Sequence, residues 1–313
     1  MNKRILSIFV FSAALLSVQA QDGKGGISDA MLNQIKQSYE GTSADKALRN
    51  AIGNNDIRKL ALNQENLTGM DTHFSVKVNS KGITDQKSSG RCWLFTGLNV
   101  MRAKAIGKYG FQSFEFSEIY PFFWDQLEKA NLFVQGIVDT RDKPLIDKTV
   151  EWLFQHPLSD GGTFTGVADI VGKYGLVPKE AMPETNSSDN TSRMANLISL
   201  KLKEYGLQLR DLASNGAKPA ALDKEKTAML GTIYRMLVLN LGVPPTEFDY
   251  VRKDAQGNPA ETEHHTPMSF LKKYGDENLL TNYVMVMNDP SREYYKCYEI
   301  DYDRHRYDGQ NWT

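Results

Sequence analysis

The segment from Cys92 to Ile106 constrains the fold more than any other part of this sequence, because apolar residues occupy nearly every face of the helix it would form. Such a helix presents no polar side to water and has to be covered by other elements all round. Gly107 follows it and is a residue type that commonly ends helices. We therefore expect a helix from Cys92 to Ile106 at the centre of a globular domain, with Cys92 in its first turn.

The overall composition is that of a globular protein and excludes several other classes. The chain has 313 residues, of which 41% are hydrophobic and 24% charged, and its net charge is −1. A disordered chain would have fewer apolar residues, and a coiled coil would be richer in charge. The absence of a Lys/Arg-rich run argues against nucleic acid as a partner. Two cysteines, Cys92 and Cys297, are too few for a disulfide-rich scaffold.

The first twenty residues have the pattern of a secretory signal peptide. A positive start, Asn2-Lys3-Arg4, precedes an apolar run over 5–18, and small residues occupy Val18 and Ala20. The apolar run is shorter than the roughly 20 residues that a membrane-spanning helix needs. We therefore expect cleavage after Ala20, export to the periplasm or the medium, and no stable membrane anchor.

Helical patterns fill most of the chain, which turns toward strands mainly at its end. Alternation of apolar and polar residues predicts a short early strand over 74–78, and β-forming residues predict two more over 283–287 and 294–302. We expect five regions: a signal peptide over 1–20, an N-terminal helical arm over 21–70, a helical subdomain with Cys92 over 71–185, a helical insertion over 186–275, and the first strands of a β-rich subdomain over 276–313.

The loop before Cys92 carries the residues that point to chemistry. In the first turn of a helix, the helix dipole and the free backbone N–H groups stabilise a thiolate, which is the nucleophilic form of cysteine. Gly90 permits close approach of a substrate to the backbone. Gln86 lies six residues before Cys92 and could fold back to donate a hydrogen bond to the oxyanion of a tetrahedral intermediate. Two alternatives stay open: a buried structural cysteine and a disulfide between Cys92 and Cys297.

The residues around Cys92 resemble a known peptidase family. The sequence Ser89-Gly90-Arg91-Cys92-Trp93 is similar to the C-G-[SA]-C-[WY] signature of papain-like peptidases. The wider run over 84–102 resembles the bleomycin hydrolase/aminopeptidase C family. Further similar stretches lie at 114–117, 122–125, 160–162 and 173–179.

This resemblance implies an α+β, papain-like fold in which 71–185 is the helical subdomain. It implies Cys92 as nucleophile, Gln86 as oxyanion-hole donor, and Gly161-Gly162 as the segment that pairs with substrate backbone. It also implies an aminopeptidase that acts on peptides, needs no metal or other cofactor, and forms a ring-shaped homo-oligomer.

A cysteine peptidase also needs an imidazole base and a residue that orients it. At papain spacing the base would lie about 130–150 residues after the cysteine, but no histidine occurs between His156 and His264. In the family that this chain resembles, both residues come later, in a β-rich half. We therefore expect the general base His and the orienting Asn to be absent from this chain, which would be incomplete, poorly stable and weakly active. The alternative is a non-catalytic remnant or interaction protein that keeps the first half of the fold.

The spacing of two other groups of histidines argues against a catalytic or metal-binding role. His305 and Asn311 are of the right types for a base and its orienter, but they are only six positions apart, too close for residues on two different strands. His264-His265 follow Glu263, but the metal-binding spacing His-Glu-x-x-His is missing, which favours a surface loop.

Overall fold

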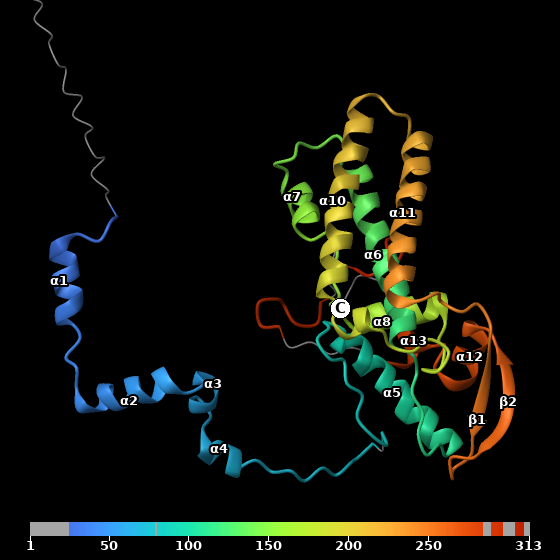
Figure 1. The fold of residues 1–313 in the computed structure, drawn as a ribbon, viewed down its shortest axis with the longest axis horizontal. Helices are drawn as coiled ribbons and strands as arrows, with labels where there is room; N and C mark the ends of the chain where they lie inside the picture. The colour runs from blue at the N-terminus through green and yellow to red at the C-terminus, as the bar shows by residue number, and fades with distance from the viewer. Residues whose placement is uncertain (1–24, 79, 284–288, 297–303, 310–313) are drawn as a thin grey trace, which may run out of the picture. The chain divides into compact units, whose positions relative to one another are not determined.

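The computed structural model describes residues 25–78, 80–283, 289–296 and 304–309, and Figure 1 shows their course. The chain divides into two compact units, Met1–Ser75 and Val76–Thr313. The expected signal peptide lies outside the described residues, as do most residues of the two strands expected near the end of the chain. None of the described helices combines the length and the apolar character that crossing a membrane requires.

The first unit is helical, as its sequence pattern predicts. Its described helices are α1 (Asp29–Gln37), α2 (Ser43–Asn54), α3 (Ile57–Leu60) and α4 (Gln64–Thr68). Side chains satisfy the free N–H groups at their starts. At α2, for example, Thr42 and Asp45 form a reciprocal capping box.

The second unit is built around α5 (Cys92–Tyr109) and α6 (Ile119–Asp139), with α8 (Phe164–Tyr174) in contact with both. The expectation that α5 ends at Gly107 is wrong. The helix continues to Tyr109 and ends at Gly110, whose φ of 69° is the left-handed conformation that glycine adopts readily. Gly107 has open space around it and is tolerated inside the helix.

The expectation that α5 is buried all round is also only partly met. Most of the helix is buried, but Cys92, Thr96 and Val100 are exposed, one turn apart along one stripe. A helical period of 3.6 residues places positions i, i+4 and i+8 on the same side. Cys92 is therefore at the end of the one exposed edge of an otherwise enclosed helix.

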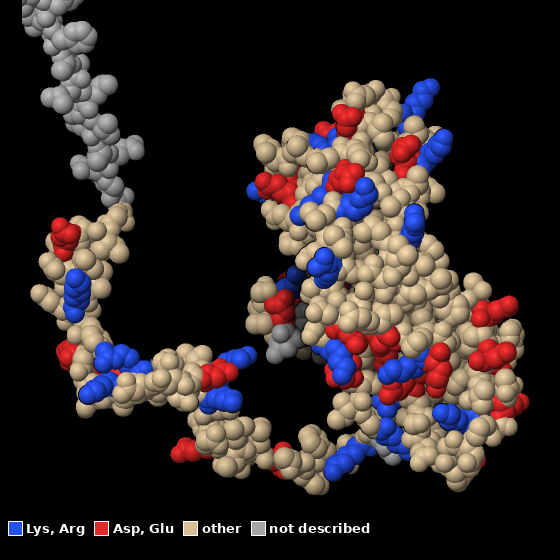
Figure 2. Space-filling model, viewed as in Figure 1, with Lys and Arg blue, Asp and Glu red and all other residues tan. Residues whose placement is uncertain are grey.

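Two long helices, α10 (Ser192–Ser214) and α11 (Pro219–Leu241), run antiparallel and pack on α6 (Figure 1). The shorter α7 (Lys148–Gln155) packs on α6 as well. A further short helix, α9 (Asn186–Asp189), precedes α10. Figure 2 shows acidic and basic side chains mixed over the visible face of this unit, in keeping with the net charge of −1.

The strands of the described residues are β1 (Phe248–Lys253) and β2 (Pro259–His265), which form an antiparallel hairpin. Strands are therefore not confined to the end of the chain, contrary to the sequence pattern. The expectation of a strand over 74–78 is wrong, because the backbone is irregular there. The hairpin packs beside α12 (Pro267–Tyr274), which is followed by α13 (Leu279–Asn282). The result is an α+β fold that is mostly helical.

Candidate active site

Cys92 is the first residue of α5 and is exposed as a free thiol. No side chain caps this helix start, so the backbone N–H groups of Cys92 and Trp93 are left without a capping partner. This arrangement agrees with the placement expected from the sequence. It disagrees with the alternative of a buried structural cysteine. The other partner of the alternative disulfide, Cys297, lies outside the described residues.

The Arg91 side chain anchors the residue before Cys92. It is fully buried, and its guanidinium binds the Glu184 carboxylate at 3.0 and 2.8 Å. The same group donates to the Ser188 carbonyl at 3.0 Å and lies over the rings of Phe95 and Phe122. A planar guanidinium is suited to such a two-point ion pair, which fixes geometry as well as charge. The start of α5 is thus tied to the segment before α10.

Asp160 is a second anchor of the same loop. Its Oδ2 accepts hydrogen bonds from the Gly90 backbone N–H at 2.7 Å and from the Thr191 hydroxyl at 2.6 Å. Its backbone carbonyl accepts from the Trp93 indole at 2.8 Å. A Cβ at Gly90 would overlap the Asp160 carboxylate, so the close approach that requires glycine here is made by Asp160. The Cys92 loop and the glycine segment over 159–163 are therefore one connected structure.

Gln86 folds back onto the loop, as the sequence reasoning expected, and bonds within it. Its Nε2 donates to the Ser89 carbonyl at 2.6 Å, and the Ser89 hydroxyl donates to the Gln86 carbonyl at 2.7 Å. An amide nitrogen carries two hydrogens. One of them is engaged with Ser89, which leaves the second for another acceptor.

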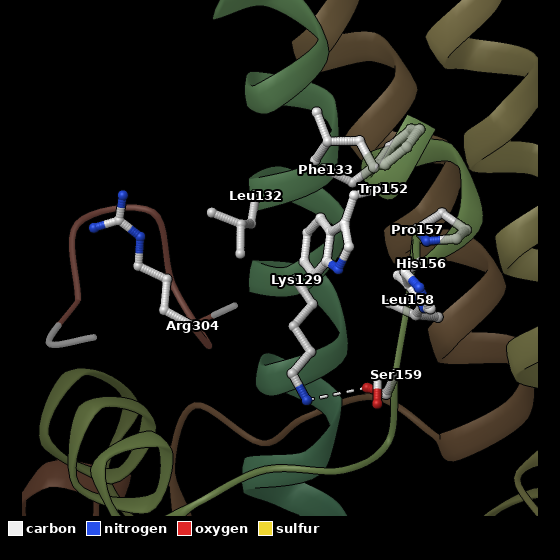
Figure 3. Close-up of a pocket in the computed structure, with 10 residues that line it drawn as sticks. Lys129, Leu132, Phe133, Trp152, His156, Pro157, Leu158, Ser159 and Arg304 are labelled. Atoms are coloured by element: carbon white, nitrogen blue, oxygen red, sulfur yellow. Dashed lines mark hydrogen bonds between the residues drawn. The ribbon is translucent and has the colours of Figure 1, made fainter. Parts of the chain in front are cut away.

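The glycine segment is held mainly through its carbonyl groups. Lys129 Nζ donates to the carbonyls of Ser159 and Gly161 at 3.0 and 2.6 Å, as Figure 3 shows for Ser159. Gln126 donates to the Ser159 carbonyl at 2.9 Å. Within the described part of the chain, by contrast, the backbone N–H and C=O of Gly162 have no hydrogen-bond partner. Gly162 is exposed, so these two groups are open to a ligand.

His305 packs against this glycine segment, next to Gly162 and Gly166. Its candidate partner in the sequence, Asn311, is outside the described residues. The Nδ1 of His305 is 2.5 Å from Asp125 Oδ1, and the Thr163 N–H points at its Nε2 over 3.4 Å. Both ring nitrogens thus have partners other than Cys92. All five histidines are described, and no hydrogen bond joins any of them to Cys92.

The His264-His265 pair lies on β2, so the expectation of a surface loop is wrong. Alternation along the strand exposes His264 and buries His265 against Glu263, with Nε2 and Oε2 at 2.8 Å. The described residues include no group of three or more potential ligands arranged to hold a metal ion.

Two adjoining cavities flank the glycine segment and share Lys129, Ser159 and Arg304. One has a volume of about 300 Å³ and is walled mainly by apolar side chains between α6 and α7 (Figure 3). The other has a volume of about 320 Å³ and is lined by Gly161, Gly162, Thr163 and His305. The open backbone groups of Gly162 therefore border a hollow next to the loop that carries Cys92.

A free thiol at a helix start, held against a glycine segment, is the arrangement that the motifs around Cys92 predicted, and comparison with known proteins gives the family. The chain belongs to the Peptidase C1-like family, which it matches over residues 26–312. This confirms the resemblance and the papain-like fold that the sequence motifs indicated.

Individual relatives give the same result. The chain is 36% identical over 278 residues to aminopeptidase C of Lactobacillus delbrueckii subsp. lactis, covering 88% of this chain and 61% of that protein. It is 32% identical over 284 residues to bleomycin hydrolase of Mus musculus, covering 88% and 62%. The crystal structure of PepW from Lactobacillus rhamnosis superposes with a TM-score of 0.83 at 35% identity, covering 91% of this chain and 64% of that one. The chain thus spans about six-tenths of the length of these relatives.

The structure brings Cys92, Gln86, Gly90, Gly161 and Gly162 into one neighbourhood through anchors that the sequence reasoning missed. Those anchors are the side chains of Arg91, Trp93, Asp125, Lys129 and Asp160. The available signal was a pair of charged residues, Asp125 and Lys129, four apart on a helix whose side chains are mostly apolar. Such residues are rarely buried without a partner.

Proposed function

We propose that this chain is a cysteine peptidase that acts at the amino end of peptides, with Cys92 as nucleophile. The observation that carries the proposal is the exposed free thiol at the start of α5, fixed against a glycine segment whose Gly162 backbone groups are open. Family membership supports the reaction class. The names of the relatives, aminopeptidase C and bleomycin hydrolase, support the substrate class of peptides.

The proposed reaction proceeds through a thioester. The Cys92 thiolate attacks the carbonyl carbon of the first peptide bond, and the carbonyl electron pair moves onto oxygen. The Cys92 backbone N–H and the remaining N–H of Gln86 Nε2 stabilise that oxyanion. Collapse breaks the C–N bond as the amine nitrogen takes a proton from water, and the proton released by the carboxylic acid in the later hydrolysis neutralises the hydroxide that remains. Water then hydrolyses the thioester, which releases the amino-terminal residue and restores the thiolate.

Substrate main chain would pair with the N–H and C=O of Gly162, and Gly161 would leave room for it. We do not assign the base to His305, because both of its ring nitrogens have other partners. Since general acid–base catalysis contributes roughly 10² to 10⁴ in rate, we expect this chain to turn over slowly. It needs no metal in this mechanism.

The test measures hydrolysis of leucyl-aminomethylcoumarin and the rate of alkylation by iodoacetamide near pH 6. We expect Cys92 to react with iodoacetamide at least about tenfold faster than glutathione, as an activated thiolate does. Cys92→Ala should abolish both signals, and Cys297→Ser is the matched control that should keep them. Turnover that survives Cys92→Ala would overturn the proposal. No turnover together with an ordinary thiol rate would favour the non-catalytic alternative.

We also propose that the protein is exported after cleavage behind Ala20, because residues 1–20 have the charge and apolar pattern of a signal peptide. Amino-terminal sequencing of the mature protein should find Gln21 first; a start at Met1 would contradict export by this route. A homo-oligomer is proposed on the family resemblance alone. Light scattering after size exclusion measures it directly, and a mass of one chain would refute it.

A further inference from the structure

His305 is buried beside the proposed site, although no step of the proposed reaction uses it. Its side chain is 7% exposed, and its ring centroid is 4.5 Å from that of Trp93, the residue next to Cys92. The described segment over 304–309 carries it there, and Tyr307 of the same segment donates a hydrogen bond to Asp139 at 2.9 Å. A polar ring in such a position requires specific partners.

The glycines of the neighbouring segment are shaped around this ring. A Cβ at Gly162 would overlap the His305 imidazole and crowd the Trp93 indole, and a Cβ at Gly166 would overlap the imidazole too. The backbone of Gly162 is therefore packed directly on the two rings. The positions of His305 and Trp93 therefore determine the path of the main chain at Gly162.

Asp125 connects His305 to the other support of the glycine segment. This carboxylate is completely buried and also binds Lys129 Nζ at 2.9 Å, while Lys129 holds the carbonyls of Ser159 and Gly161. Burial by itself raises the pKa of Asp125, but Lys129 and His305 outweigh burial and hold that pKa below its usual value. An ionised carboxylate only accepts hydrogen bonds, so the Nδ1 of His305 donates to Asp125, while the Thr163 N–H points at the Nε2 of the same ring.

We propose that His305 is a positioning residue for substrate binding: bonded to Asp125 and packed on Trp93, it holds the backbone of Gly162 in the conformation that receives the main chain of a peptide. This inference rests on the proposed function, because it assumes that peptides bind along Gly162. It separates two properties of the site. His305 should govern how well a peptide is held and should leave the intrinsic reactivity of the Cys92 thiol unchanged.

Two alkylating reagents measure these properties separately in the full chain. Iodoacetamide is too small to use the glycine segment, so its rate reports the thiolate alone. Glycyl-phenylalanyl chloromethyl ketone also alkylates the sulfur, but it presents a peptide backbone. We expect His305→Ala to lower the peptidyl rate by roughly tenfold or more, since small misplacements in a site cost up to about a hundredfold. The iodoacetamide rate should stay within about twofold of the unaltered chain.

Control variants separate positioning from general loss of structure. Tyr307→Phe loosens the same segment away from the glycines and should leave both rates unchanged. His305→Gln retains the length and polarity of the side chain, so we expect it to lose less of the peptidyl rate than His305→Ala does. It takes the place of His305→Ala if circular dichroism shows that His305→Ala is unfolded. Because His305 lines an open cavity, millimolar imidazole should partly restore the peptidyl rate of His305→Ala without changing its iodoacetamide rate.

Equal rates in all variants would overturn the inference, and so would a parallel fall with both reagents, which would make His305 a general structural residue. These outcomes differ from failure of the proposed function. If the proposed function is wrong, Cys92 of the unaltered chain would react with iodoacetamide no faster than an ordinary thiol. The peptide backbone of the chloromethyl ketone would not raise its rate of alkylation, and no substitution at position 305 would change this.

Discussion

Replacing Glu118 by Gln should stabilise the protein at alkaline pH. Glu118 precedes α6 and is 3% exposed, and its Oε2 has no hydrogen-bond partner among the described residues. Burial raises the pKa of this carboxyl to about 7, against an ordinary value of 4.5; Lys179 opposes the increase, and Glu184 and Glu115 add to it. The folded protein thus holds this proton more tightly than the unfolded chain does.

The sign and size of the effect follow from proton linkage. Between pH 4.5 and pH 7 the folded state binds more protons than the unfolded state, so the contribution of Glu118 to stability falls as the pH rises. One pKa unit corresponds to about 1.4 kcal/mol, which gives a loss of about 3 kcal/mol by pH 8. A neutral Gln avoids this loss. We expect Glu118→Gln to match the unaltered protein near pH 4 and to exceed its free energy of unfolding by up to about 3 kcal/mol at pH 8.

Urea unfolding followed by tryptophan fluorescence measures the stability of the second unit, Val76–Thr313, to which Glu118 belongs. All four tryptophans of the sequence lie after residue 75. Midpoints at pH 4, 6 and 8 give the pH dependence, and comparison with the unaltered protein cancels the other titrating groups. Glu115→Gln is the matched control: this half-buried residue pairs with Lys179, so its loss should bring no gain at pH 8. A difference between Glu118→Gln and the unaltered protein that does not grow with pH would refute the reasoning.

Three further predictions concern the anchors of the fold. Arg91→Met should lower the free energy of unfolding by about 3–5 kcal/mol, because it leaves the carboxylate of Glu184 without its buried partner; a urea midpoint close to that of the unaltered protein would contradict this. Gly90→Ala should cost about 1–3 kcal/mol and change the alkylation rate of Cys92, since the added Cβ displaces Asp160. Unchanged stability and rate would show that the loop absorbs the methyl group. Thr266→Ala should cost about 1 kcal/mol by removing the capping box of α12, and Thr266→Ser should recover most of that loss in the same melts.

The sequence predicted the place of Cys92 because the determinants there are local. An apolar run defines α5, and a loop rich in glycine and polar residues defines its start, so the position of the thiol follows from short-range pattern alone. The same kind of pattern predicted a helical region over 186–275, within which α10, α11 and α12 lie. At the other end of α5 it failed by three residues, because Gly107 on an exposed face does not stop a helix while the left-handed Gly110 does.

Strand β2 of the hairpin escaped prediction because its inward side chains are polar. On β2 the buried residues are Glu263 and His265, which bond to each other, and Glu263 also binds Lys273 and Tyr274. Burial would raise the pKa of Glu263, but these partners lower it to about 2. Hydrophobic alternation cannot reveal a strand whose core-facing positions are a glutamate and a histidine, because the pattern depends on apolar side chains.

His305 shows why the spacing of residues along the sequence is not enough to identify every residue of a candidate site. Sequence reasoning tested His305 against Asn311, its neighbour along the chain, and found the separation too short for a catalytic pair. The partner in the structure is Asp125, 180 residues earlier on α6, and the space for the ring is provided by glycines at 162 and 166. Each of those residues has an ordinary local explanation in the sequence, as a charge in a helix or a glycine near a helix start. Only their convergence under the glycine segment gives them a common role, and that convergence is set by the packing of α5, α6 and α8.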